Sequence, residues 1–452
     1  MIADGMSIAS AGRDIRAGRT SARQLTEQCL AVIAARSHQL NAFISVAADS
    51  AREQAAIADR EMASGLDRGP LHGIPVSLKD LIDVAGVPTS AASGVRAGHV
   101  ASHDAVVVTR LRQAGAVLVG KTNLHEFALG TTNEDSAYGP GRHPLDDSRS
   151  SGGSSGGSAI SVATGMAFAS VGTDTGGSIR IPAAACGVVG LKPAYGEIPV
   201  DGIVPLSSSL DHVGPLCRTA EDAELVYDAL LASSPSKPGV RRRQAHEIRL
   251  GVPRAYFLSM MDSEVAGEFE AACARLADAG AVIREVTIAQ TELIGAVYLH
   301  VSLPEAVAYH AATLEQMPER YTPAVRGRLE AGRYLLAEDY VRAQRGRVEL
   351  RASVEAALEG CDALLLPTLP IPAPTIGVPT ITIGGKEELV RNVMLRLTQL
   401  FNITGHPAIA MPCGSTRAGL PVSAQLVGHS NQTPSLLAVA RALEPHLSLP
   451  AN

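Results

Sequence analysis

Tryptophan is absent from this sequence of 452 residues, and aromatic residues make up only 3% of it. Surfaces that stack bases depend on aromatic side chains, so such a surface is not expected. Basic residues are not in excess either, because 39 Lys and Arg stand against 45 Asp and Glu and the net charge is −6. Proteins that bind nucleic acid neutralise phosphates with Lys and Arg. The composition therefore argues against a nucleic acid partner.

Cysteines are few, and long apolar runs are missing. The six cysteines are scattered, with no C-x-x-C pair, which argues against a disulfide framework and against a zinc site. No run of about 18 uncharged apolar residues is present, and the N-terminus has no apolar core of a signal peptide. We therefore expect a cytoplasmic protein with reduced thiols and no membrane partner.

Helical and strand patterns alternate along most of the chain. Ser21 can cap a helix whose apolar residues recur at helical spacing, and an Ala-rich helical pattern follows at 47–63. Short apolar runs typical of buried strands lie at 74–78, 116–119, 167–172, 248–252, 363–366, 408–412 and 422–427. This alternation predicts an α/β fold with a largely buried sheet.

The sequence predicts one domain over residues 1–452, with a helical subregion at about 263–358. The Gly/Ser-rich stretch 148–158 and the Pro-rich stretch 367–379 are too short to separate independent domains. The stretch 232–246 contains three consecutive arginines and is expected to be an exposed connector.

Residues 115–122 match the phosphate-binding pattern G-x-x-x-x-G-K-[ST] letter by letter. A phosphate loop must leave its backbone N–H groups free, whereas the Ala-Val-Leu-Val run at 116–119 is typical of a buried strand. We therefore interpret Lys121 as a structural residue at the end of a strand.

Residues 152–156 match G-x-S-x-G, the pattern around a nucleophilic serine in α/β-hydrolases. That turn follows an apolar strand, but residues 144–150 have the composition of a loop, which argues against Ser154 as a nucleophile with a histidine partner. A flexible linker is also disfavoured, because the small apolar run 159–163 suits a closely packed helix.

Ser178 is the better candidate nucleophile, because it follows the strand at 167–172 and a Gly-Gly turn. Backbone N–H groups of this turn can point toward one centre, as an oxyanion hole requires. The residues that supply them are Thr175, Gly176, Gly177 and Ser178. Asp174 and Arg180 bracket the turn and either pin it or form an ordinary ion pair.

A serine nucleophile needs a base, and both histidine and lysine are available. His72, His125 and His212 lie near the segments above, so a Ser-His arrangement stays open. Lys79 has the stronger position, because it ends the strand at 74–78 and ligand sites of open α/β sheets lie beyond such strand ends. Burial can lower the pKa of a lysine by about 3–5 units, and neutral lysine can accept a proton. The alternative is a Lys79 that only pairs with a carboxylate.

Together these segments resemble the amidase signature family. The residues that carry the resemblance are 73–80, 120–123, 152–158, 172–180 and 186–193. The dense similarity covers about residues 70–220, and a looser likeness continues to the C-terminus through 401–412 and 419–428. The resemblance implies a mixed, twisted β-sheet packed between layers of α-helices.

The family pattern implies a Ser-cis-Ser-Lys triad. Ser178 would form an acyl-enzyme, Ser154 would sit on a cis peptide and relay protons, and Lys79 would act as general base and then as acid. The resemblance implies hydrolysis of a C–N acyl bond without a metal or organic cofactor. Supporting positions within the matching motifs are Asn123, Ser155, Asp174 and Arg180.

Departures from the family bear on the substrate. The A subunit of glutamyl-tRNA amidotransferase carries a mid-chain motif resembling Asn-Leu-Ala-Arg-Phe/Tyr-Asp-Gly that helps to hold glutamine, and residues 301–310 contain no clear counterpart. The hydrophobic N-terminal anchor of fatty-acid amide hydrolases is also missing. We therefore expect a stand-alone hydrolase of small amides, anilides, carbamates (urethanes) or ureide-type compounds, with esters as a side activity. The segments expected to shape its pocket are 127–138, 204–211, 298–309 and 367–379.

Three alternatives stay open. The chain could be the glutaminase-type A subunit of an amidotransferase complex, a catalytically silent binding protein, or a Ser-His hydrolase. For the leading hypothesis we expect a small-molecule substrate, a monomer or homodimer, and no obligate partner.

Overall fold

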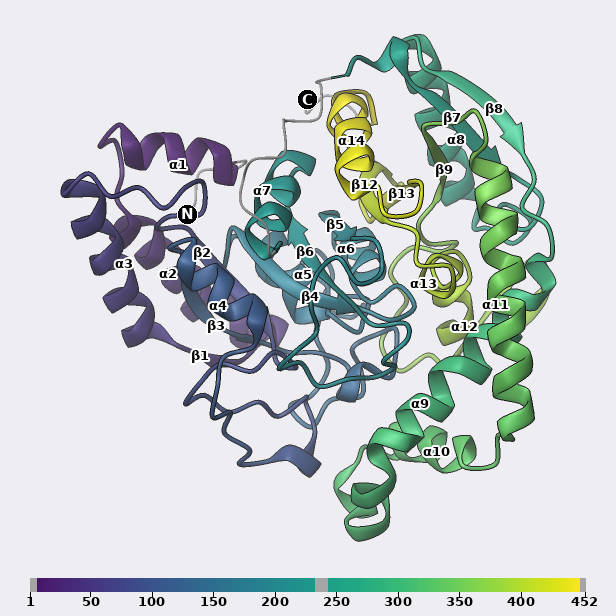
Figure 1. Ribbon diagram of the computed structural model, residues 1–452, viewed down its shortest axis with the longest axis horizontal. Helices are drawn as coiled ribbons and strands as arrows, with labels where there is room; N and C mark the ends of the chain where they lie inside the picture. Colours follow the sequence, from purple (N-terminus) through teal and green to yellow (C-terminus); the bar gives the residue numbers. More distant parts are fainter. Residues whose placement is uncertain (1–5, 232–242, 448–452) are drawn as a thin grey trace.

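The computed structural model describes residues 6–231 and 243–447, whose centre is a mixed sheet of 11 strands (Figure 1). From one edge to the other, the strands are β1 (Phe43–Val46), β3 (Val117–Thr122), β2 (Pro75–Lys79), β4 (Ala169–Asp174), β6 (His212–Cys217), β5 (Val189–Lys192), β12 (Ala408–Ser415), β13 (Pro421–Val427), β9 (Ala363–Pro367), β7 (Arg249–Pro253) and β8 (Val282–Val286). A separate hairpin is formed by β10 (Thr380–Ile383) and β11 (Lys386–Leu389).

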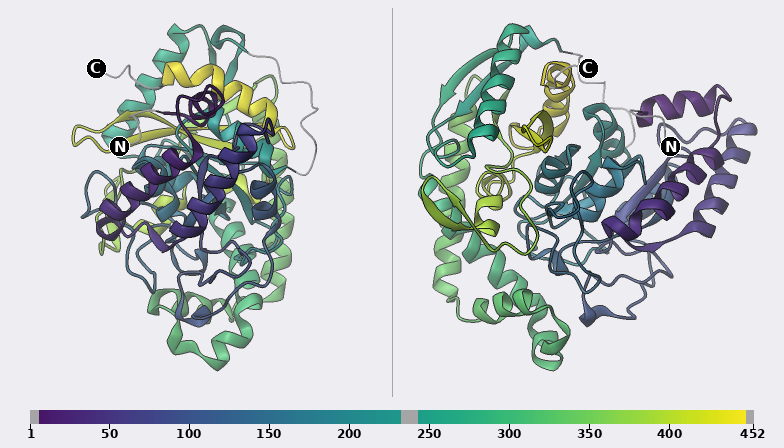
Figure 2. Two further views of the ribbon diagram at one scale, coloured as in Figure 1. Left: turned by 90° about the vertical axis from the view of Figure 1, so that its left-hand side faces the viewer. Right: turned by 180° about the vertical axis from the view of Figure 1, so that it is seen from behind.

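Helices cover both faces and both ends of the sheet. They are α1 (Ile8–Arg16), α2 (Ala22–Leu40), α3 (Ala48–Ala63), α4 (Val106–Gln113), α5 (Gly156–Ala163), α6 (Arg180–Cys186), α7 (Ala220–Leu230), α8 (Ser263–Asp278), α9 (Ile294–Gln316), α10 (Pro323–Gly332), α11 (Ala337–Leu358), α12 (Val390–Leu395), α13 (Leu400–Ile403) and α14 (Thr433–Leu447). Figures 1 and 2 show α1–α3 at one end of the molecule and α9–α11 at the other. No helix within residues 6–231 and 243–447 is both long and apolar enough to cross a membrane.

The alternation of side chains along β3 shows how the sheet separates two cores. Leu118 packs in the core that contains α4 and α7, whereas Val117 and Val119 pack on the other face with α3 and α5. Successive side chains of a strand point to opposite faces, so both faces of this strand are covered by helices. The expected fold, a mixed sheet between layers of α-helices, is therefore confirmed.

Most predicted elements are present with small shifts of their ends. Ser21 caps α2 through a capping box with Gln24, as the sequence predicts. Four strands of the main sheet were not predicted, namely β1, β5, β6 and β8. Pro215 lies inside β6, and β8 is half exposed and contains an Arg-Glu pair, so neither has the apolar pattern of a buried strand.

The match to a phosphate loop at 115–122 is a strand. β3 is hydrogen-bonded to β1 on one side and to β2 on the other, which occupies its backbone N–H groups. The Lys121 ammonium lies 2.8 Å from Asp80 in a buried ion pair. The interpretation of Lys121 as a structural residue is confirmed.

The connector expected at 232–246 lies mostly outside the described residues, which resume at Arg243. That arginine is half-buried and pairs with Asp362 at 2.6 Å. Helices α8 to α11 occupy the stretch in which a helical subregion is expected. The organisation as a single domain stays a prediction.

The site is positioned by three neighbouring strands. β2 runs parallel to β3 and to β4, so the carboxyl ends of all three meet at one edge of the sheet. Lys79 is the last residue of β2, and Asp174 is the last residue of β4, directly before the turn at 175–178. Parallel packing therefore brings together a lysine and a serine turn that lie about a hundred residues apart in the chain.

Candidate active site

The Lys79 amine is fully buried and donates two hydrogen bonds. Its Nζ lies 2.7 Å from Ser154 Oγ and 2.8 Å from Thr173 Oγ1, a side chain of β4. Burial lowers the pKa of Lys79 to about 7, against the opposing charges of Asp174 and Asp211. Within the described part of the chain, no carboxylate forms an ion pair with this amine. Lys79 can therefore exchange a proton with a serine hydroxyl near neutral pH.

Ser154 lies on the loop that leads into α5, and the Gly153–Ser154 peptide bond is cis. Its carbonyl oxygen accepts a hydrogen bond of 3.0 Å from the backbone N–H of His125. Only glycine fits before it, because a Cβ on Gly153 would lie 2.7 Å from the backbone nitrogen of Asn133. The loop therefore presents its serine hydroxyl to Lys79 from a tightly packed backbone.

Ser155 links this loop to the turn that carries Ser178. The Ser155 N–H donates to the carbonyl oxygen of Ser178 at 3.1 Å, and its hydroxyl donates to Thr173 O at 3.2 Å. Among the described residues, Ser178 Oγ has no hydrogen-bond partner, and the side chain is only 6% exposed. The structure thus joins Lys79 to Ser154, whereas a direct hydrogen bond between the two serine hydroxyls is not formed.

The turn before Ser178 needs both of its glycines. Gly177 has a φ of +141°, and a Cβ on Gly176 would collide with the hydroxyl of Tyr298. The Gly176 carbonyl is held by Thr398 Oγ1 at 2.6 Å. The backbone N–H groups of Thr175, Gly176, Gly177 and Ser178 donate to no other described residue. They are therefore free to donate to an oxyanion.

The ion pair of Asp174 with Arg180 fixes the two ends of this turn. Both side chains are 0% exposed, and Arg180 donates to both carboxylate oxygens of Asp174 at 3.1 Å. The same carboxylate accepts the backbone N–H of Ile179 at 3.1 Å, directly after the nucleophile candidate. Burial works against the charged form, yet the charge of Arg180 and its hydrogen bond lower the pKa of Asp174. These contacts support the interpretation that the ion pair fixes the turn, rather than that it is an ordinary ion pair.

Further residues at the site were missed by the sequence analysis. Asp211 is half-buried and accepts hydrogen bonds from Thr175 Oγ1 at 2.6 Å and from the backbone N–H of Leu206 at 2.9 Å. Burial raises the pKa of Asp211 to about 6. Asn402 donates to both the carbonyl and the carboxylate of Asp174 at 2.8 Å. Asp211 lies in the segment 204–211 and Asn402 in the segment 401–412. Both segments were identified from the sequence, but neither residue was given a role.

Asn123 supports the surrounding loops. Its side-chain amide donates to the carbonyl oxygens of Asn41 at 3.1 Å and Gly139 at 3.0 Å, and its oxygen accepts from Ser136 Oγ at 2.8 Å. These contacts tie the loop after β3 to two others, so the side chain acts on the fold around the site. Within the described ranges, no group of three or more His, Cys, Asp or Glu side chains could hold a metal ion.

None of the three candidate histidines contacts either serine hydroxyl in the described part of the chain. His72 lies before β2, at the opposite end of that strand from Lys79, and contacts Glu61 at 3.0 Å. His125 lies 3.1 Å from Asp135. His212 donates through Nδ1 to Leu210 O at 2.7 Å, and it lies opposite Asp174 in the register of β6 and β4. The contacts favour Lys79 as the base.

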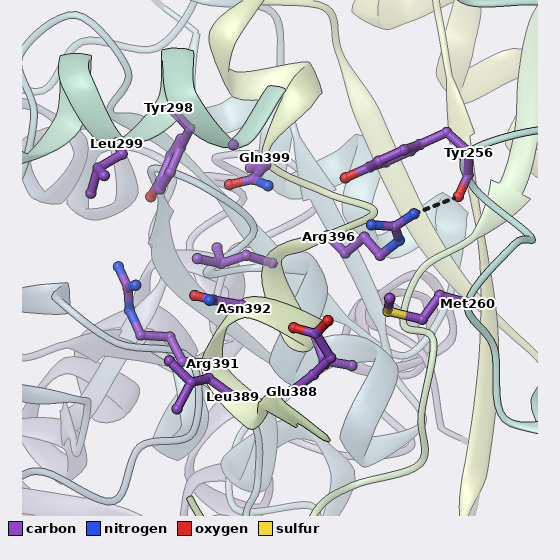
Figure 3. Close-up of a pocket in the computed structure, with 13 residues that line it drawn as sticks. Tyr256, Met260, Tyr298, Leu299, Glu388, Leu389, Arg391, Asn392, Arg396 and Gln399 are labelled. Atoms are coloured by element: carbon purple, nitrogen blue, oxygen red, sulfur yellow. Dashed lines mark hydrogen bonds between the residues drawn. The ribbon is translucent and has the colours of Figure 1, made fainter. Parts of the chain in front are cut away.

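Two cavities lie near the turn at 175–178, and of these two the smaller is lined by a residue of the turn, Thr175. The larger has a volume of about 480 Å³ and is shown in Figure 3; its walls come from Tyr256 to Met260, from α9 and from residues 388–399. The smaller has about 70 Å³ and touches Thr173, Thr175 and Asp211. Of the segments expected to shape the pocket, 298–309 contributes to the larger cavity, and 127–138 (through Ala128) and 204–211 contribute to the smaller, whereas 367–379 lines neither of the two. The walls at 256–260 and 388–399 were not predicted.

Comparisons with known proteins agree with this geometry. A family model described as amidase matches residues 24–437. The glutamyl-tRNA(Gln) amidotransferase A subunit of Anaeromyxobacter dehalogenans is 39% identical over 99% of this chain and 97% of its own length. An amidase from Pseudomonas putida is also 39% identical, over 92% of this chain and 90% of its own. A crystal structure of an amidase superimposes with a TM-score of 0.92 at 39% identity, covering 98% of this chain and 100% of the other.

Proposed function

The chain belongs to the amidase signature family of hydrolases, and from this premise we propose that it is a stand-alone enzyme that cleaves small amides. Anilides, carbamates and ureide-type compounds share the acyl–nitrogen bond and are included in the proposed substrate class, with esters as a side activity. Ser178 is the proposed nucleophile, Ser154 the relay, and Lys79 the general base and acid.

In the proposed acylation, neutral Lys79 takes the hydroxyl proton of Ser154 while Ser154 Oγ takes the hydroxyl proton of Ser178. Ser178 Oγ then bonds to the carbonyl carbon, and the carbonyl oxygen becomes an oxyanion that accepts hydrogen bonds from backbone N–H groups of the turn, which are those of Thr175, Gly176, Gly177 and Ser178. The Lys79 ammonium returns its proton through Ser154 to the leaving nitrogen. The C–N bond breaks, the amine departs, and an acyl group remains on Ser178.

Deacylation repeats the same relay with water. A water molecule gives a proton through Ser154 to Lys79 and bonds to the acyl carbon. The ester bond to Ser178 then breaks, and Lys79 returns the proton through Ser154 to Ser178 Oγ. The acid leaves, and all three side chains regain their starting protonation states.

The buried amine of Lys79 is the single observation that carries the proposal. A group that acts first as a base and then as an acid works best when its pKa is close to the working pH. Burial lowers the pKa of Lys79 to about 7. Its hydrogen bond of 2.7 Å to Ser154 Oγ supports proton transfer between these two atoms.

A second candidate, the glutaminase-type A subunit of an amidotransferase complex, is favoured by the relatives that carry that name. The segment 301–310 argues against it. Glu305, its acidic residue, accepts hydrogen bonds from Ser207 Oγ at 2.6 Å, the Ser209 N–H at 3.0 Å and the Tyr340 hydroxyl at 3.0 Å. This carboxylate is therefore occupied with the neighbouring turn and is not free for a ligand.

A panel of amides, anilides, carbamates and esters tests the proposal on the purified chain, with Ser178→Ala as the matched control. We expect turnover of at least one C–N class without any added protein, and none in the variant. Release of ammonia from glutamine only when a partner protein is added would favour the second candidate. No turnover of any compound, with no acyl adduct on Ser178 by intact mass, would contradict both enzymatic hypotheses.

A further inference from the structure

The 480 Å³ cavity lies next to the turn that precedes the proposed nucleophile, although no residue of the turn itself lines it. Tyr298, from α9, forms part of its wall, and the Tyr298 hydroxyl occupies the space that a side chain on Gly176 would need. Gln399 lines the cavity directly after Thr398, whose hydroxyl holds the Gly176 carbonyl. The Tyr298 side chain therefore contacts both the turn and the cavity, and a substrate bound at the turn would reach the cavity alongside this ring.

Arg391, from α12, is the unusual side chain of this cavity. In the part of the chain that the structure describes, it forms no ion pair and no hydrogen bond, and its Nε is buried without a partner. Figure 3 shows its guanidinium pointing toward the Tyr298 hydroxyl. Burial lowers the pKa of Arg391, and Tyr298 is the one group that opposes this effect, so no carboxylate compensates the charge.

The other two charged side chains of the cavity do not neutralise Arg391. Arg396 lies over the ring of Tyr256, 3.8 Å from its centroid, and donates to Tyr256 O at 3.0 Å and to Ser259 Oγ at 3.2 Å. Glu388 also lines the cavity but forms no ion pair with Arg391. Arg391 is therefore the cation of this wall that is free to bind a ligand.

A partly buried guanidinium without a counter-ion is unfavourable, and a carboxylate is the group that its two parallel N–H bonds fit. The cavity offers one such cation, with the amides of Asn392 and Gln399 nearby, and the carboxylate of Glu388 would repel a doubly charged anion. The wall therefore suits a singly charged carboxylate better than a phosphate.

We infer that Arg391 binds a carboxylate of the substrate, so that the preferred substrates are amides carrying a free carboxylate within reach of the scissile bond. The inference rests on the proposed function, because it takes Ser178 to be the place of reaction. The volume of about 480 Å³ agrees with the pockets of about 300–1,000 Å³ that hold small ligands in proteins.

Matched pairs of amides test this inference. Glutaramate and glutaramide differ in one charge on the acyl side, and N-acetyl-β-alanine and N-butylacetamide differ in one charge on the amine side. We expect kcat/KM for the charged member of at least one pair to be higher by about tenfold to one-hundredfold. Arg391→Gln should abolish this preference, and Arg391→Lys should keep part of it, since a lysine keeps the charge but loses the two-pronged geometry.

Arg23→Gln is the matched control, because it removes one positive charge from an exposed position on α2, at the other end of the molecule. It should keep the preference for the carboxylate. Equal kcat/KM for both members of each pair in the wild type, or a preference that survives in Arg391→Gln, would overturn the inference. If Arg391→Gln does not fold, the wild-type ratios and the Arg391→Lys variant decide.

Calorimetric binding of glutaramate to Ser178→Ala separates this inference from the proposed function. If the dissociation constant of glutaramate is at least about tenfold higher for Ser178→Ala/Arg391→Gln than for Ser178→Ala, the carboxylate site is supported even if no amide is hydrolysed. Hydrolysis of neutral amides with no effect of a carboxylate on rate or binding would overturn the site and leave the proposed function standing.

Discussion

Lys79 and Ser154 are joined by a hydrogen bond of 2.7 Å between the lysine Nζ and the serine Oγ, and both side chains are fully buried. The lysine comes from the end of a strand and the serine from a loop 75 residues later. Among the described residues, Lys79 is the amine placed to receive a proton that leaves this serine.

Loss of the amine should abolish catalysis. We expect Lys79→Met to lower kcat/KM by about a thousandfold or more, because no other described group near Ser154 can accept its proton. The double variant Lys79→Met/Ser154→Ala should be no slower than the slower single variant, since members of one relay are not additive. Steady-state kinetics on the best substrate of the panel measure both, and additive losses would argue against a shared relay.

Loss of the buried ion pair should destabilise the whole molecule. Asp174→Asn leaves the guanidinium of Arg180 buried without a counter-charge, and we expect the free energy of unfolding to fall by about 3–5 kcal/mol. The surface pair of Arg326 with Glu330, each more than 40% exposed, is the matched control. Urea denaturation of Arg326→Gln should show a change of about 1 kcal/mol or less. Similar losses in both variants would contradict the account of the buried pair.

The glycine before the relay serine should tolerate no side chain. In Gly153→Ala the new Cβ would lie 2.7 Å from the backbone nitrogen of Asn133, so the loop must move. We expect a lower melting temperature and a large loss of kcat. Gly267→Ala is the control: this glycine lies in α8 with nothing within 4 Å of the new Cβ, and the change should stabilise by about 0.5–1 kcal/mol. Full activity in Gly153→Ala would show that the packing of this loop is not needed.

The hydroxyl of Thr175 should matter for rate more than for binding. Thr175→Val removes the hydrogen bond of 2.6 Å to Asp211 that anchors the turn, and we expect kcat to fall by about tenfold to one-hundredfold. Thr175→Ser keeps the hydroxyl and should restore most of the rate. A change confined to KM in Thr175→Val would mean that the anchor acts on substrate binding alone.

The sequence predicted the parts of the site that depend on local pattern. Lys79 follows a short apolar strand, and Ser178 follows a strand and two glycines, so both could be found from neighbouring residues. Asn402 could not, because it reaches Asp174 from 228 positions further along the chain. The pocket wall with Arg391 was missed for the same reason: the fold alone brings α12 beside α9.

The central claim is tested most directly by the pH dependence of Ser178 labelling with phenylmethanesulfonyl fluoride, followed by intact mass. A lysine is a base only when neutral, and burial lowers the pKa of Lys79 to about 7, so labelling should rise as the pH increases through 7 and level off above pH 8. This rise should disappear in Lys79→Met. A rate that is flat from pH 5 to pH 9, or that rises only near the pKa of an exposed lysine at about 10.4, would contradict the account.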